Sequence, residues 1–142
     1  MRRDTVEMFG PIGMVLAAVG IWLAPYPAEA AGKYDGSVPF VCAAIAVTEC
    51  GAEGECQRRT AESVNLPPFV KVDVKAMKVR AEEKGRESSI KHVEHMNGKM
   101  ILHGAELERA WILTIHEDTG KLSGVVSADG EGYVIFGACT LP

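Results

Sequence analysis

The sequence predicts an all-β protein: a small antiparallel meander of six to eight strands that closes into a barrel or sandwich and is stapled by disulfides. Apolar and polar residues alternate with a period of two over much of the chain, and no long helical pattern competes with this alternation. Turn signals separate short candidate strands at spacings of about 8 to 12 residues. The chain has four cysteines, an even number, which can form two disulfides within such a domain.

Residues 1–30 have the features of an export signal rather than of a folded domain. Two arginines at positions 2 and 3 precede an uncharged apolar run over Met8–Ala24, and an Ala-Glu-Ala cleavage site follows at 28–30. The alternative is an uncleaved membrane anchor, for which this run is at the short end of the ~20 residues required. We therefore expect a periplasmic or secreted protein of residues 31–142, with membrane contact only through the signal segment if it stays uncleaved.

Residues 31–142 have the length of one compact domain, so we expect a single exported β domain. The formal net charge of the whole chain is −4, and no basic run or stripe is present. Both observations argue against a nucleic-acid or anionic-lipid partner. The longest polar stretch, Arg80–Ser89, mixes both signs of charge and predicts a solvated loop.

The four cysteines predict two structural disulfides in an oxidising compartment. Cys50 and Cys56 flank a short glycine-containing loop that can close on itself, which leaves Cys42 to pair with Cys139 and join the first strand to the last. Other pairings of four cysteines remain open at this level. The spacings contain no CxxC redox motif, no haem-attachment motif and no zinc-binding pair of pairs.

In the first half of the domain, Val38–Thr48 predicts a first strand rich in Val, Ile and Ala. A second strand is predicted over Phe69–Val79, where valines alternate with charged residues, and the Pro67-Pro68 pair sets an extended lead-in. The segment between Cys56 and Leu66 is polar and holds at most one short helical turn.

The second half is a series of hairpins. Asn97-Gly98 is a strong signal for a two-residue turn because both residues tolerate positive φ. It joins Ile90–Met96 to Lys99–His103. The later strands, Trp111–His116, Leu122–Ser127 and Tyr133–Cys139, are separated by Asp118-Thr119-Gly120 and by Asp129-Gly130, with Glu117 and Lys121 as an opposite-charge pair beside the first of these turns.

These last strands carry apolar residues on both faces. Trp111, Leu113 and Ile115 lie on one face, whereas Ile112 lies opposite and Val125 and Val126 are also split. We expect one face to form the core and the other to be covered, either by the Cys50–Leu66 segment or by a second copy of the protein.

A candidate metal site follows from the Asn97-Gly98 turn. A two-residue turn places His92 opposite His103 with Cβ atoms about 5 Å apart, and Glu94 shares their face. Two imidazoles and a carboxylate can bind zinc or copper, but a solvated histidine pair on the surface is the commoner arrangement. We expect the histidine pairing without a bound metal.

A candidate ligand site involves Trp111 and Tyr133, which can line a pocket in the mouth of a barrel, with Arg109 at its rim. The alternative is that both aromatic side chains simply pack in the core. No serine lies in a GxSxG context, and the glycines at 130 and 132 do not lead from a strand into a helix. We therefore expect no enzymatic activity and no cofactor.

The general plan of an exported, disulfide-bonded all-β domain of about this size is similar to that of periplasmic lysozyme inhibitors and of small calycins. The similarity concerns the plan and involves no matched motif, so it implies a fold and not a function. We expect a binding or accessory protein without catalytic activity, whose partner is another exported protein or a small apolar ligand. The alternatives are a lipocalin-like carrier of a small ligand or metal, and an inhibitor of an extracytoplasmic hydrolase.

Overall fold

A computed structural model describes residues 33–81, 83 and 85–142, so the predicted export signal lies outside the described residues. Within this part of the chain, no helix is long and apolar enough to cross a membrane. The elements are β1 Phe40–Gly51, β2 Cys56–Arg59, the 3₁₀ turn η1 Glu62–Val64, β3 Phe69–Asp73, β4 Lys78–Ala81, β5 Arg86–Met96, β6 Lys99–Glu106, β7 Arg109–His116, β8 Lys121–Ala128 and β9 Glu131–Thr140. The predicted all-β class is therefore confirmed.

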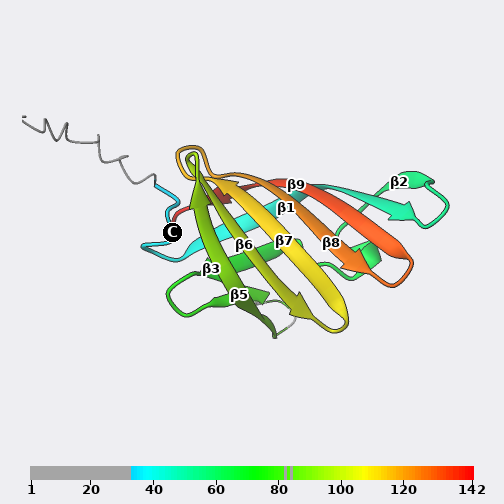
Figure 1. Cartoon of the computed structure of the whole chain (residues 1–142), viewed down its shortest axis with the longest axis horizontal. Helices are drawn as coiled ribbons and strands as arrows, with labels where there is room; N and C mark the ends of the chain where they lie inside the picture. Colours follow the sequence, from blue (N-terminus) through cyan, green and yellow to red (C-terminus); the bar gives the residue numbers. More distant parts are fainter. Residues whose placement is uncertain (1–32, 82, 84) are drawn as a thin grey trace, which may run out of the picture.

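The strands form a closed antiparallel barrel of eight strands (Figure 1). From β3 to β9 each strand pairs with the next along the chain, and β1 closes the barrel by pairing with β9 on one edge and with β3 on the other. The second half of β1 extends past β3 and pairs with β2, which forms a short flap on the barrel. Of the two predicted architectures, the barrel is correct.

The turn chemistry that predicted the hairpins is present in the structure. Asn97 and Gly98 have φ values of 52° and 69°, and Met96 pairs with Lys99 as a two-residue turn requires. Gly120 has a φ of 69° and its N–H donates to the carbonyl of His116 at 2.8 Å. Because the turns fix the register, the boundaries of β5 to β9 differ from the predicted ones only by extensions at the strand ends.

Two predictions about the middle of the chain are wrong. The single strand expected over Phe69–Val79 is a hairpin, because the chain turns after Asp73: the Asp73 carboxylate accepts from the Ala76 N–H at 2.9 Å, and Met77 has a φ of 55°. The loop expected over Arg80–Ser89 is mostly strand, since its two ends belong to β4 and β5 and pair with each other. Arg80, Arg86 and Glu87 lie on these strands, and Arg80 contacts Glu87 at 2.8 Å.

The β6–β7 turn contains no glycine, asparagine or proline, so the sequence does not predict it. Leu107 and Glu108 have φ values of 49° and 63°, which residues other than glycine rarely adopt.

The predicted Glu117–Lys121 pair is replaced by another contact: the Glu117 carboxylate contacts Nδ1 of His95 at 2.5 Å.

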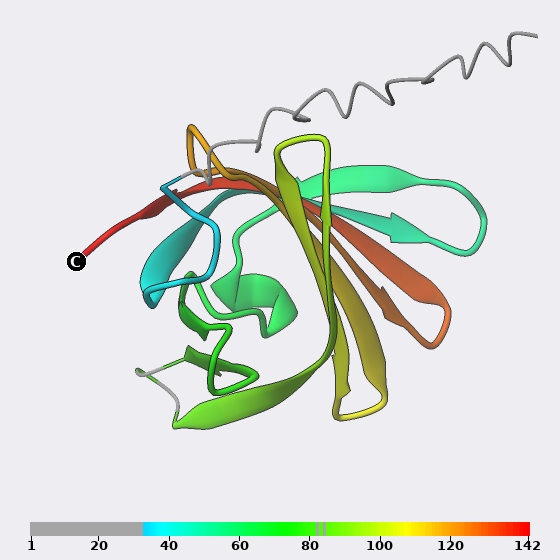
Figure 2. The same cartoon turned by 60° about the vertical axis from the view of Figure 1, so that its left-hand side comes forward.

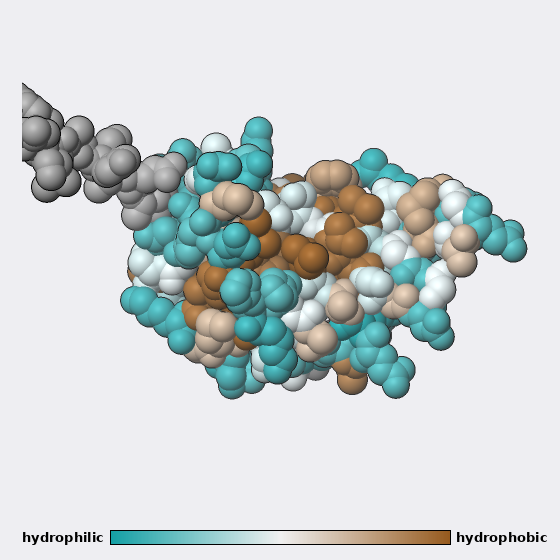
Figure 3. All heavy atoms as spheres, in the orientation of Figure 1, coloured by the Kyte–Doolittle hydropathy of each residue, from teal (hydrophilic) through white to brown (hydrophobic). Residues whose placement is uncertain are grey.

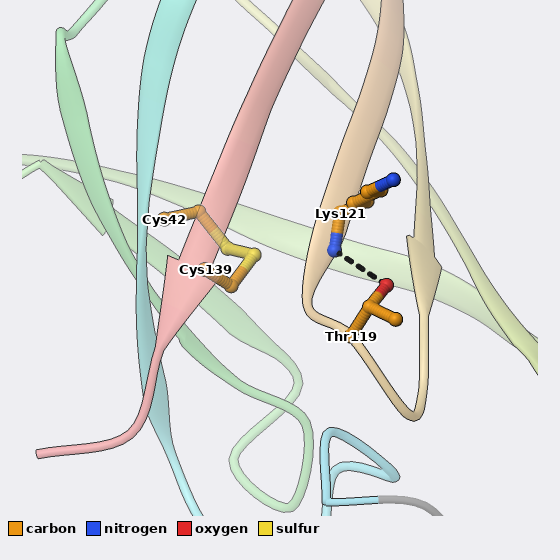
Figure 4. The surroundings of a disulfide bond; sticks show 4 residues. All are labelled: Cys42, Thr119, Lys121 and Cys139. Carbon is orange, nitrogen blue, oxygen red and sulfur yellow. Dashed lines mark hydrogen bonds between the residues drawn. A yellow bond between two sulfur atoms is a disulfide. The ribbon is translucent and has the colours of Figure 1, made fainter.

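Both predicted disulfides are confirmed. Cys42 and Cys139 are direct cross-strand neighbours on β1 and β9, so their bond joins the two strands that close the barrel (Figure 4). Nearby, the backbone N–H of Lys121 donates to the Thr119 hydroxyl at 3.3 Å and tightens the β7–β8 turn. Cys50 and Cys56 bridge the hairpin of β1 and β2.

The core fills the barrel and is continuous. Phe40, Val72, Leu102 and Ile115 are at most 1% exposed. One end of the barrel is covered by the chain that precedes β1: Tyr34 packs edge-on against Phe40 and its N–H donates to the carbonyl of Glu117 at 2.8 Å. The opposite end carries the candidate site.

Candidate functional site

A cavity of about 110 Å³ lies inside the barrel. Most of its lining is apolar and comes from nearly every strand of the barrel. The apolar residues are Cys42, Ala44, Leu66, Pro67, Pro68, Val70, Val79, Trp111, Leu113, Leu122, Val126 and Ile135. An apolar cavity of about 150 Å³ can bind benzene, so this one has room for a compact group of roughly that size or slightly smaller.

The cavity is covered by the segment Thr60–Pro68, here called the cap segment. It contains η1, which lies within the curve of the sheet (Figure 2). Ala61, Val64 and Leu66 are buried in the core, so the segment packs its apolar side chains into the barrel while its polar residues stay exposed. At its end the carbonyl of Pro68 accepts from the N–H of Ala44 at 2.8 Å, where β1 has a bulge.

Two arginines connect the cap segment to the barrel. Nη1 of Arg86 donates to the carbonyl of Asn65 at 2.9 Å, and Nη1 of Arg109 donates to the carbonyl of Val64 at 3.2 Å. These carbonyls lie in and just after a short 3₁₀ turn, where the backbone has too few partners of its own. Arg86 and Arg109 therefore provide the hydrogen bonds that hold the cap segment over the cavity.

Only a few polar side chains line the cavity, and their contacts hold them in fixed positions. Arg86 forms a salt bridge with Glu106 at 3.0 Å, with about a fifth of each side chain exposed. Ser88, which is 7% exposed, accepts a hydrogen bond from Nε1 of Trp111 at 2.9 Å. An apolar pocket with a few fixed polar groups is the usual composition of a small-molecule site.

Of the three predicted ligand-site residues, the structure brings Arg109 and Trp111 into the cavity lining. Tyr133 is 2% exposed and does not line the cavity; it lies beneath Arg109, whose Cζ is 5.4 Å from the centre of the ring. Arg86, Ser88 and Glu106 were missed, because their positions depend on the pairing of β4 to β7 and no local motif marks them.

The Tyr133 hydroxyl donates a short hydrogen bond to the carboxylate of Glu131. This bond, together with burial, raises the pKa of Tyr133 above its ordinary value, while the nearby Arg109 acts in the opposite direction. Tyr133 and Glu131 therefore form a fixed pair beside the cavity rather than a free acid and base.

The predicted metal-site residues lie on the outside of the barrel. His92 and His103 are cross-strand partners with ring centres 5.0 Å apart, as the Asn97-Gly98 turn predicts. Glu94 lies on the same strand as His92 and is exposed, as are both histidines. Among the described residues, no group of three or more His, Cys, Asp or Glu side chains is arranged to hold a metal ion.

The outer face of β7, β8 and β9 carries an exposed apolar patch, visible in brown in the middle of the face shown in Figure 3. Ile112, Val125 and Val134 are successive cross-strand partners, and Phe136 and Ile45 continue the patch onto β9 and β1. Ile112 and Val125 are about half exposed. The Cys50–Leu66 segment does not cover this face, contrary to one of the two expectations, because its apolar residues lie in the core.

Compared with known proteins, the chain matches no protein-family model, no curated protein and no solved structure.

Proposed function

We propose that this protein is a small exported barrel that binds a compact apolar molecule in its interior and does not transform it. The observation that supports this proposal is the cavity of about 110 Å³ with its largely apolar lining. Burying an apolar group there is favourable by about 25 cal/mol per Å² of apolar surface removed from water. The two disulfides fit an oxidising compartment, and the signal-like segment at 1–30 supports export.

The absence of catalysis is part of this proposal. Apart from Arg109, the polar side chains of the lining are engaged with other lining residues: Arg86 with Glu106, and Ser88 with Trp111. Ser88 has no histidine beside it to act as a base, since the histidines nearest to it in sequence lie on the outer face or the far end of β5. A nucleophile without a neighbouring base is weak.

A pair of adjacent valines gives a direct test. Val126 lines the cavity and is 6% exposed, whereas its neighbour Val125 lies on the outer face and is 49% exposed. Val126→Phe fills the cavity, and Val125→Phe adds the same volume outside it. Titration with benzene, followed by NMR shifts of cavity methyl groups, should show saturable binding in the wild type and Val125→Phe but none in Val126→Phe. Equal behaviour of all three proteins would refute an interior site.

Export is tested separately. N-terminal sequencing of the protein recovered outside the cytosol should begin near Ala31. Recovery of the intact N-terminus in a membrane fraction would favour an anchor instead.

A second candidate function is an accessory module for another exported protein. It is favoured by the apolar patch around Ile112, Val125 and Phe136, because contiguous exposed apolar surface of this kind commonly marks a protein interface. Val125→Asp should abolish co-purification of such a partner while benzene binding in the cavity persists. Loss of benzene binding without loss of the partner would argue against this assignment of the two surfaces.

A further inference from the structure

The charges at the rim of the cavity do not balance. Arg86 at the start of β5, Glu106 at the end of β6 and Arg109 at the start of β7 all line the cavity at the same end of the barrel. Two guanidinium groups thus face one carboxylate. A positive charge in a partly buried, largely apolar site attracts an anion more strongly than it would in open water, since the local dielectric constant is lower.

Arg109 is the rim arginine that forms no salt bridge within the described chain. Glu106 is its direct cross-strand partner in the backbone, yet the Glu106 carboxylate forms its salt bridge with Arg86 instead. The carboxylates around Tyr133, which lies beneath Arg109, are engaged as well: Glu131 accepts the Tyr133 hydroxyl, and Glu49 pairs with Arg59. Among the described residues, no carboxylate lies within 4.0 Å of the Arg109 guanidinium.

Arg109 is nevertheless held in place. Its Nη1 donates to the carbonyl of Val64, and the group lies over the ring of Tyr133. A guanidinium has five N–H donors in a planar fork, and within the described chain the Arg109 side chain forms one hydrogen bond, the one to Val64. The remaining donors suit the two oxygens of a carboxylate, which a planar fork binds in a bidentate manner.

We propose that the cavity binds a small organic carboxylate, with its anionic group on Arg109 and its apolar part among Trp111, Leu113 and Val126. This inference rests on the proposed function and specifies the class of ligand. The cavity volume limits the apolar part to about five or six carbon atoms. A ligand with a cationic group is disfavoured by Arg109, and a neutral one leaves the charge imbalance uncorrected.

The test compares hexanoate with hexanamide, which has the same shape and no charge. Protein purified from a host expressing the full chain is titrated with each compound by calorimetry at neutral pH. Wild type should bind hexanoate about tenfold more tightly than hexanamide, since charge-assisted hydrogen bonds are about twice as strong as neutral ones. Arg109→Gln should remove this preference, so that hexanoate and hexanamide bind with similar affinities. Arg58→Gln, a matched change on an exposed arginine of the β2 flap, should retain the preference.

Each result distinguishes the two proposals. Equal affinities for hexanoate and hexanamide in the wild type would overturn the carboxylate assignment while interior binding stands. Binding of neither compound, together with no effect of benzene, would overturn the proposed function itself. A preference that persists in Arg109→Gln would exclude Arg109 as the anion-binding residue. Should Arg109→Gln fail to fold, Glu106→Gln provides the second test: removing the carboxylate that lines the cavity should raise the preference for hexanoate over hexanamide about threefold or more. An unchanged preference would overturn the proposal.

Discussion

Gly104 and Trp111 lie directly opposite each other on β6 and β7, and the indole ring occupies the space that a side chain at position 104 would fill. A Cβ at position 104 would lie 2.4 Å from Cζ2 of Trp111 and 2.4 Å from the backbone oxygen of Ser89. The ring that forms part of the cavity wall is therefore positioned by the absence of a side chain across the strand pair.

Gly104→Ala should destabilise the protein by about 1 to 3 kcal/mol, because the indole or the β5 backbone must shift to admit the methyl group. The matched control is Gly132→Ala, since a Cβ there meets nothing within 4 Å and the residue does not have a positive φ. Urea denaturation of both variants measures the difference. Equal stability of the two variants would show that Trp111 has other room to move.

The two disulfides should differ in their contribution to stability. In the chain-entropy model, a bond across 97 residues stabilises by about 4 to 5 kcal/mol and one across six residues by about 2 kcal/mol. Replacing Cys42 and Cys139 with alanine should therefore lower the midpoint of unfolding much more than replacing Cys50 and Cys56. Calorimetry of the two double variants tests this order, which a larger loss from the short loop would contradict.

The hydrogen bond between Arg86 and the cap segment should control local opening. Arg86→Met keeps much of the side-chain volume but leaves the carbonyl of Asn65 and the carboxylate of Glu106 without this donor. We expect faster hydrogen exchange at the amides of Val64 to Leu66 and a loss of about 1 to 2 kcal/mol in stability. Lys78→Met, which breaks an exposed salt bridge with Glu87, is the control and should change neither quantity by much.

The raised pKa of Tyr133 predicts a loss of stability at alkaline pH. Because the folded state holds the phenolic proton more tightly than the unfolded state, this contribution is complete below the ordinary tyrosine pKa of 10.0 and is lost as the pH rises from there through the raised value. Absorbance of tyrosinate during a pH titration should show the late transition. The hydrogen bond to the Glu131 carboxylate is the largest cause of the raised pKa, so Glu131→Gln should move the tyrosinate transition toward 10.0. Tyr133→Phe should remove this transition.

The His92–His103 pair should bind zinc only weakly. Two imidazoles without a third protein ligand make an incomplete site for zinc, and both rings are exposed. Zinc titration by calorimetry should give no tight one-to-one isotherm. A tight isotherm that disappears in His103→Ala would overturn this prediction and establish the metal site.

The parts of the fold that follow from local turn chemistry were predictable. Asn97-Gly98 determines the register of β5 and β6 and hence the contact of His92 with His103. The glycine at 120 likewise fixes the β7–β8 turn. Where a turn lacks such residues, as at Leu107 and Glu108, the sequence contains no local signal, and the pairing of β6 with β7 over its full length supplies the stabilisation instead.

The candidate site was only partly predictable, for a related reason. Arg109 and Trp111 stand out as a charge and an aromatic side chain at a strand start. The role of Arg86 depends on Asn65 and Glu106, which are 21 and 20 residues away in the chain, and no periodicity connects them. The cap segment has the composition of a polar loop, yet Val64 and Leu66 are buried, because closure of the barrel creates an interior that they can fill.

The pairing of β1 with β9 also has a consequence for the order of folding. The strands from β5 to β9 are consecutive hairpins whose contacts are local, so they can form quickly. β1 precedes the other strands in the chain, but its pairing with β9 requires the last strand. Until that strand is present, Cys42 can pair with β3 through the backbone but lacks its disulfide partner Cys139, while Cys50 and Cys56 can already form a bond across their short loop. Early closure of that loop keeps Cys50 away from Cys42, so the smaller disulfide protects the larger one from mispairing until the last strand arrives.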